Sequence, residues 1–228
     1  NSKLKSIGQS AFSNTSIECI SIPSHLIQIE SNAFAFCYDL SRIDFSNDSE
    51  LQLIGKRVFY KTKIENIAIP SSVLDIQAGF AMGNSATINI DPNNNRFLLY
   101  QQKFLLSKTD LKNDIYDIIL LASSEIKTVK IFPFINKIAS YAFANCKNLQ
   151  NVDFSQNKNL FSIEKYSFNN TSLKNITIPS KIVKIGKNSF SLCASLKKVD
   201  FESHSNLVSF ENYAFAWSSL IEISFPSS

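Results

Sequence analysis

The feature that most constrains the fold is a short cassette that recurs along the chain. It reads as an aliphatic residue, two spacers, usually Ile, often Gly or Glu, a few spacers, a small residue and then Phe. Seven copies of one cassette predict a solenoid in which each repeat packs on its neighbours. The copies are LKSIGQSAF (4–12), LIQIESNAF (26–34), LQLIGKRVF (51–59), INKIASYAF (135–143), LFSIEKYSF (160–168), IVKIGKNSF (182–190) and LVSFENYAF (207–215).

The spacing of the cassette phenylalanines indicates that two repeat types alternate. Phe12 and Phe59 are 47 residues apart, and so are Phe143 and Phe190. One type closes on Ile-Pro or Phe-Pro, whereas the other carries Cys three residues after the Phe and closes on a polar corner. We expect the phenylalanines to stack as an internal ladder that anchors the repeats. Its members are Phe12, Phe34, Phe59, Phe143, Phe168, Phe190 and Phe215.

A run of alternating β-branched or aromatic residues precedes the close of each repeat. Such alternation predicts a strand of about three to five residues, in which every second side chain points inward. Proline directly afterwards ends the strand, because it cannot donate to a sheet ladder. We therefore expect one parallel strand per repeat of 22 to 25 residues. The runs are Ile20-x-Ile22, Ile43-x-Phe45, Ile67-x-Ile69, Val152-x-Phe154, Ile176-x-Ile178, Val199-x-Phe201 and Ile223-x-Phe225.

Composition excludes several classes of protein. The chain has 228 residues, of which 44% are hydrophobic and 18% charged, which is typical of a folded, soluble chain. It lacks an apolar run long enough to cross a bilayer, so no membrane span is expected in this segment. The net charge of +4 comes from scattered lysines and points to no nucleic-acid partner. Because the sequence opens at Asn1 without Met, we expect an excised or processed segment.

The cassette L-x-x-I-G-x-x-A-F-x-x-C-x-x-L-x-x-I-x-I-P resembles the leucine-rich repeat of the BspA-like surface antigens. The resemblance implies an α/β-type repeat solenoid, a leucine-rich repeat arc with short parallel strands on its concave side and loops or short helices on its convex side. It implies a single domain over 1–228, with repeats in 1–90 and 126–228. It also implies a cell-surface or extracellular protein of a bacterium or protozoan parasite, used in adhesion to host matrix or cell-surface proteins, to glycans or to other microbes.

Residues 91–125 interrupt the period. They begin with Asp91-Pro92-Asn93-Asn94, which resembles the start of an insert found in the same family. We expect a β-hairpin patch here, with Gln101 and Gln102 at the turn between 97–100 and 103–106, and a third strand within 115–122. Insertions in solenoids often carry function, so Tyr100, Lys103 and Tyr116 are candidate ligand contacts. The alternative is that the insert only covers the core at the point where the repeat period is interrupted.

The outward residues of the predicted strands form a second candidate surface. Asp44, Asp153 and Asp200 recur there on the longer repeats. Carboxylates about 10 Å apart cannot share one cation, so the row is either a solvated face or a site for an extended polypeptide or glycan.

The sequence shows no catalytic constellation, metal-ligand cluster or cofactor motif. Both histidines, His25 and His204, are expected in polar corners. The recurring cysteines Cys37, Cys146 and Cys193 should be free buried thiols, since linear stacking keeps them apart.

Three functions remain open. The first is a non-enzymatic protein-binding module that serves in adhesion or host interaction. The second is an intracellular scaffold of the same fold, which unpaired thiols favour. The third is a carbohydrate-active β-solenoid enzyme, which would need clustered carboxylates on one face.

Overall fold

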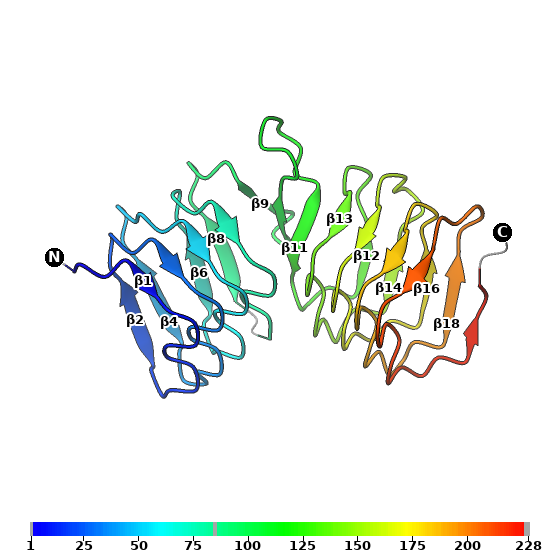
Figure 1. Cartoon of the computed structure of the whole chain (residues 1–228), viewed down its shortest axis with the longest axis horizontal. Helices are drawn as coiled ribbons and strands as arrows, with labels where there is room; N and C mark the ends of the chain where they lie inside the picture. The colour runs from blue at the N-terminus through cyan, green and yellow to red at the C-terminus, as the bar shows by residue number, and fades with distance from the viewer. Residues whose placement is uncertain (1, 84–85, 226–228) are drawn as a thin grey trace. The chain divides into compact units, whose positions relative to one another are not determined.

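The computed structural model describes residues 2–83 and 86–225, which form two compact units. Unit 1 comprises residues up to Leu99 and unit 2 begins at Tyr100. Each unit is a stack of coils with strands running parallel from coil to coil (Figure 1). The prediction of a single domain over 1–228 stays a proposal.

The predicted strands are present in both units. Most of their inward residues are buried and most of their outward residues are exposed, as in β6 (Asn66–Ile69), where Ile67 and Ile69 face the core. Pro23, Pro70 and Pro179 directly follow three of these strands, and Pro226 lies outside the described residues. The others are β2 (Cys19–Ile22), β4 (Arg42–Phe45), β8 (Thr87–Ile90), β12 (Thr128–Lys130), β14 (Asn151–Asp153), β16 (Asn175–Ile178), β18 (Lys198–Phe201) and β20 (Glu222–Ile223).

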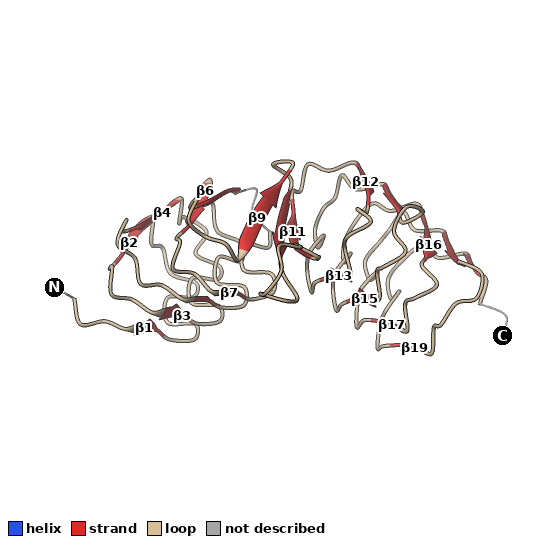
Figure 2. Ribbon diagram, turned by 90° about the horizontal axis from the view of Figure 1, so that it is seen from above, coloured by secondary structure: helices blue, strands red, loops and turns tan. Residues whose placement is uncertain are grey.

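A second ladder of two-residue strands runs through the cassettes, where the sequence led us to expect only one strand per coil. The cassette isoleucine ends most of these strands and is buried, as Ile29, Ile54 and Ile185 are. The two ladders lie on different sides of each coil (Figure 2). The strands are β1 (Ser6–Ile7), β3 (Gln28–Ile29), β5 (Leu53–Ile54), β7 (Asp75–Ile76), β13 (Lys137–Ile138), β15 (Ser162–Ile163), β17 (Lys184–Ile185) and β19 (Ser209–Phe210).

The prediction of short helices on the side opposite the long strands is wrong. No residue described by the structure is helical, so the fold is all-β and not of α/β type. The cassette instead forms turns, because every second N–H bonds to the neighbouring coil. The N–H groups of Asn32, Phe34 and Phe36 donate to the carbonyls of Lys56, Val58 and Tyr60 at 2.8, 3.1 and 2.7 Å. A helix needs its N–H groups for its own i→i−4 bonds, so these inter-coil bonds exclude it.

This turn geometry places two residues of each full cassette in the left-handed region, two positions before and two after the Phe. That conformation costs roughly 1 kcal/mol for most L-residues. Inter-coil hydrogen bonds stabilise it at every repeat. The residues are Ser10, Asn14, Asn32, Phe36, Arg57, Lys61, Tyr141, Asn145, Tyr166, Asn170, Asn188, Leu192, Tyr213 and Trp217.

The phenylalanine ladder is confirmed. In unit 2, Phe143, Phe168, Phe190 and Phe215 stack with centroid separations of 4.9, 5.2 and 5.2 Å and interplanar angles of 12° or less. In unit 1, Phe12, Phe34 and Phe59 stack at 5.3 and 6.1 Å. Phe80, which ends the shorter, cassette-like segment VLDIQAGF (73–80), is also buried. Together with the inward aliphatic residues, these rings form the core.

The predicted hairpin patch is present. It contains β9 (Phe97–Tyr100), β10 (Phe104–Ser107) and β11 (Ile118–Ala122). Gln101 and Gln102 form the turn and have φ values of 51° and 56°, as in a two-residue type I′ hairpin turn. Within unit 2, β10 pairs antiparallel with β11, and β11 pairs parallel with β13. The insert is thus continuous with the second ladder.

Candidate functional site

The strand face, defined as the outward residues of the long strands, is polar, and its aspartates are paired with nearby cations or hydrogen-bond donors. Asp44 in unit 1 pairs with Arg42 at 3.0 Å, and Asp200 in unit 2 pairs with Lys198 at 3.2 Å. The Asp153 carboxylate accepts a hydrogen bond from the Ser155 N–H at 2.8 Å, which lowers the pKa of Asp153. Each predicted carboxylate therefore has a partner on its own strand or at that strand's end.

The structure does not bring these carboxylates together. Asp153 lies on β14 and Asp200 on β18, with β16 between them. Asp200 also lines a hollow of about 200 Å³ with Phe201, His204 and Phe225. No group of three potential metal ligands occurs in the part of the chain that the structure describes.

The insert residues predicted to bind a ligand have different surroundings. The Tyr100 ring is half-buried and packs edge-on against Phe132 and Phe134, with centroids 4.7 and 5.7 Å away. The Tyr116 ring is half-buried beneath the Lys108 ammonium, 4.6 Å from the ring centroid. Lys103 follows the hairpin turn and is exposed. The tyrosines therefore help to attach the insert to the core of unit 2.

The loop between β10 and β11, residues 108–117, is braced by side-chain hydrogen bonds. We call it the insert loop. Its base is held by Asp117, a buried carboxylate that accepts from the Thr109 N–H at 2.7 Å and from Asn136 Nδ2 at 2.9 Å. Lys108 Nζ lies 3.1 Å from Asp114 Oδ1, although the Lys108 side chain is only 5% exposed. The Asp117 hydrogen bonds therefore hold the base of the loop, and the Lys108–Asp114 ion pair adds a contact nearer its tip.

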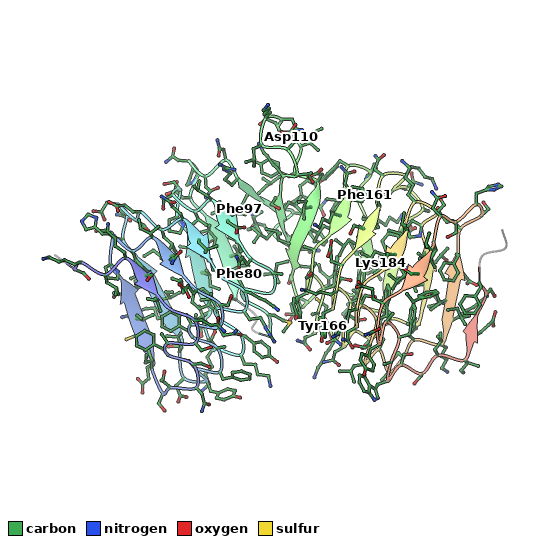
Figure 3. The ribbon with its side chains drawn as sticks, in the orientation of Figure 1. Phe80, Phe97, Asp110, Phe161, Tyr166 and Lys184 are labelled. Carbon is green, nitrogen blue, oxygen red and sulfur yellow. The ribbon has the colours of Figure 1, made fainter. Side chains whose placement is uncertain are left out.

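The tip of the insert loop carries two aliphatic side chains that the sequence reasoning missed. Leu111 and Ile115 are 55% and 53% exposed. The Lys112 N–H donates to Asp110 Oδ1 and the Ile115 N–H to Asn113 Oδ1, both at 2.9 Å. Figure 3 shows Asp110 in this loop, which projects beyond the strands of unit 2. The signal in the sequence was two isolated aliphatics in the polar run SKTDLKNDIYD.

An aromatic cluster on the surface of unit 1 was also missed. Phe36 lies between Tyr38 and Tyr60, with ring centroids at 6.3 and 5.1 Å. The Lys61 ammonium is 5.8 Å from the Phe36 centroid and 5.6 Å from that of Tyr60. These residues sit on different repeats, so only the coil register reveals their proximity.

All four cysteines are free, as predicted for Cys37, Cys146 and Cys193. Cys37 and Cys193 donate their thiol hydrogens to the carbonyls of Phe12 and Phe168, the cassette phenylalanines of the preceding coils, at 2.9 and 3.2 Å. Burial raises the pKa of Cys146 to about 12. The recurring cysteine therefore packs between coils, and the buried Cys146 thiol is poorly suited to redox chemistry.

The two histidines are exposed, as predicted. His25 Nδ1 lies 2.9 Å from Glu50 Oε1, and this contact lowers the pKa of Glu50. His204 sits in a turn with a φ of 56°.

The solved structures that resemble this chain are bacterial leucine-rich repeat proteins. The match to the pneumococcal vaccine antigen PcpA has a TM-score of 0.74 and 20% identity, and covers 95% of this chain and 61% of PcpA. A leucine-rich repeat protein from Eubacterium ventriosum matches with a TM-score of 0.72 and 20% identity, over 99% of this chain and 77% of that one. A leucine rich cell surface protein from Faecalibacterium prausnitzii matches with a TM-score of 0.56 and 19% identity, over 87% and 70%.

At these identities the likeness concerns the fold alone, and the chain spans less than two thirds of the PcpA chain. A search of the curated proteins found no match. The family model described as BspA type leucine rich repeat region matches residues 1–112 and 113–228, in six copies. Since this match extends over the whole sequence, the chain belongs to the BspA type leucine rich repeat family.

Proposed function

We propose that this chain is a non-enzymatic protein-binding module that acts at a cell surface, in adhesion or host interaction, and that the insert loop makes the main contact. The observation that carries the proposal is the exposure of Leu111 and Ile115 at the tip of a braced loop. Apolar anchors on a preformed loop bind with a smaller loss of conformational entropy than anchors on a mobile one.

Three facts support this choice of surface. The insert loop departs from a repeat that otherwise serves packing, its aliphatics contribute little to the core, and its polar groups are already hydrogen-bonded to one another. The names of the pneumococcal antigen and of the Faecalibacterium protein support a cell-surface location. Among residues 2–83 and 86–225 no helix is long and apolar enough to span a bilayer.

The free thiols favour the second candidate, an intracellular scaffold, because the cysteines of extracellular proteins are commonly paired in disulfides. Their separation in the stack accounts for the free thiols equally well in a surface protein. Against a carbohydrate-active enzyme stands the local pairing of Asp44 and Asp200, each with a cation on its own strand.

A binding screen tests the proposal. The chain would be presented to a panel of host matrix proteins, cell-surface proteins and glycans. For the partner found, Leu111→Asp with Ile115→Asp should weaken binding by at least about tenfold, the range of interface anchors. The matched control, Asp153→Ala with Asp200→Ala on the strand face, should bind as the wild type does. Loss of binding in the control with normal binding by the loop variant would assign function to the strand face.

Tyr100→Ala with Lys103→Ala separates the remaining insert candidates. Because Tyr100 packs on Phe132 and Phe134, its removal should also reduce the free energy of unfolding. Tyr116→Ala should loosen Lys108 above it and thereby the insert loop. Direct contact by Tyr100 or Lys103 predicts weaker binding even at temperatures where the variant is fully folded.

A further inference from the structure

Three lysines that lie far apart in the sequence form a row along unit 2. The residue directly before each long strand occupies the same place on successive coils, and before β12, β14, β16 and β18 these residues are Lys127, Gln150, Lys174 and Lys197. Backbone hydrogen bonds fix this register. The N–H groups of Gln150, Lys174 and Lys197 donate to the carbonyls of Lys127, Gln150 and Lys174 at 2.8, 3.3 and 2.9 Å. We call the three lysines the lysine row.

The ammonium groups of the lysine row are free to contact a ligand. All three residues are exposed, and within residues 2–83 and 86–225 none of them forms an ion pair. The carboxylates on the strands that follow already have partners. Asp153 accepts a hydrogen bond from the Ser155 N–H, and Asp200 lies 3.2 Å from the Lys198 ammonium. The lysine row is therefore a line of unpaired positive charges.

The fold does not require lysine at this position. The corresponding residues of unit 1, directly before β4, β6 and β8, are Ser41, Glu65 and Ala86. Packing therefore accepts a hydroxyl, a carboxylate or a methyl group there. Like charges on neighbouring coils repel each other, so the lysine row does not stabilise unit 2. A ligand of opposite charge would offset that repulsion.

We propose that the lysine row binds a linear acidic polysaccharide, whose sugars carry sulfate or carboxylate groups. The row crosses the starts of β12, β14, β16 and β18, which lie side by side in unit 2 (Figure 1). With neighbouring strands about 4.8 Å apart, Lys127 and Lys197 are separated by roughly 15 Å along the stack. A polymer with repeated negative charges contacts all three ammonium groups at once, whereas a small anion contacts one or two. This site is separate from the insert loop and does not rest on the protein-binding function proposed for it.

The surroundings of the lysine row favour a polysaccharide over an acidic peptide. The first outward residues of β12, β14 and β16 are Thr128, Asn151 and Asn175, whose hydroxyl and amide groups can exchange hydrogen bonds with sugar hydroxyls. An extended peptide obtains its main-chain hydrogen bonds along an open strand edge. The row instead runs across the strands, and β14 lies between β12 and β16, so no such edge is offered.

The same surroundings disfavour a single-stranded nucleic acid. Proteins that bind such strands commonly stack the bases on aromatic side chains. Neither the lysine row nor the outward residues of β12, β14, β16 and β18 include an aromatic ring. The chemistry of the row is therefore ionic, with neutral hydrogen-bonding groups beside it.

Binding of the whole chain to heparin, a linear sulfated polysaccharide, tests the proposal, with dextran as the uncharged probe. At about 0.15 M salt the wild type should bind heparin and not dextran. Lys127→Gln with Lys174→Gln and Lys197→Gln should weaken heparin binding by at least about tenfold. Each ionic contact with a linear polyanion releases counterions, so the slope of log affinity against log salt should also fall by about two to three.

The matched control removes the same amount of charge elsewhere in unit 2. Lys165→Gln with Lys181→Gln and Lys187→Gln changes three exposed lysines close to β15 and β17, on a different side of the coils from the long strands (Figure 2). This variant should bind heparin within about twofold of the wild type, because charges farther away than a Debye length are screened. Circular dichroism verifies that both triple variants are folded.

Three results would overturn the proposal. The first is a wild type that does not bind heparin, and the second is equal weakening in the two triple variants, which would show an effect of net charge alone. Polyglutamate and a single-stranded oligonucleotide are measured in parallel. Tighter binding of either one through the lysine row would show that the ligand class is wrong. The insert loop takes no part in these measurements, so they leave its proposed function unchanged.

Discussion

Replacing Phe190 by alanine should be among the most destabilising single changes in unit 2. The ring is fully buried, and Phe168 and Phe215 stack on its two faces, each 5.2 Å away. Neither neighbour can move into the space, because inter-coil hydrogen bonds hold both backbones, from the Phe168 N–H to Ser189 and from the Phe190 N–H to Ala214, each at 2.8 Å. The loss should therefore combine transfer and cavity contributions, about 3 to 5 kcal/mol.

Two variants of the same unit provide the comparison. Phe215→Ala removes a half-buried ring at the end of the ladder, where solvent fills the gap, so it should cost only about 1 to 2 kcal/mol. Phe161→Ala removes a half-exposed ring outside the ladder and should change stability by less than about 0.5 kcal/mol.

Urea unfolding, followed by circular dichroism and by fluorescence of Trp217, the single tryptophan, measures the effect in unit 2. At unchanged slope, the midpoint of Phe190→Ala should fall by about 1 to 2 M relative to that of Phe161→Ala. Coinciding midpoints would show that the ladder is not the core.

Four further predictions follow from individual contacts. Thiol titration in denaturant should find four free thiols, and in the native protein Cys19, which is exposed, should react far faster than Cys146, whose pKa burial raises to about 12; equal rates would contradict the burial. Asn157→Ala should cost about 2 to 3 kcal/mol in thermal unfolding, because its buried amide donates to Phe132 and Ile135 and accepts from Asn159 and Leu160, whereas Asn159→Ala should cost less. Gly55→Ala should destabilise unit 1 strongly, since a Cβ there would lie 2.6 Å from the Glu30 backbone, while Gly8→Ala, at the same cassette position with open space around it, should be tolerated; equal melting temperatures would refute this. Hydrogen bonds from Lys184 and from the Lys187 N–H lower the pKa of Glu211, so its small contribution to stability is present above the unfolded pKa and is lost as the pH falls through the folded pKa; Glu211→Gln should flatten this part of the acid-unfolding curve.

The repeat period was enough to predict the strands, the ladder and the free thiols. Phe143, Phe168 and Phe190 could be assigned to one stack because the fold converts equal spacing in sequence into equal position in successive coils. The same arithmetic predicted the separation of Asp153 and Asp200.

Two features could not be predicted from the repeat period. Short helices were expected where turns occur, because the family resemblance implied them, and only the inter-coil bonds of Asn32, Phe34 and Phe36 show that the backbone forms turns instead. The second feature is the ladder of two-residue strands, such as β1, β3, β5 and β7, which depends on the same contacts between coils.

The insert has no second copy for comparison, so its contacts could not be inferred from period. Tyr100 was expected at the surface, yet it packs on Phe132 and Phe134, which follow it by 32 and 34 residues in the chain. Leu111 and Ile115 were overlooked because their exposure depends on the conformation of the insert loop. Hydrogen bonds to Asp117 and Asn113 stabilise that conformation, and the sequence pattern does not reveal it.

Hydrogen exchange with and without the partner found in the binding screen tests most directly that the insert loop is the contact surface. Binding should slow exchange in residues 108–117, where the backbone amides of Thr109, Lys112 and Ile115 are bonded only to side chains in the free protein. Exchange in β12, β14, β16 and β18 should not change. Protection of those four strands with no change in residues 108–117 would contradict the account and place binding on the strand face.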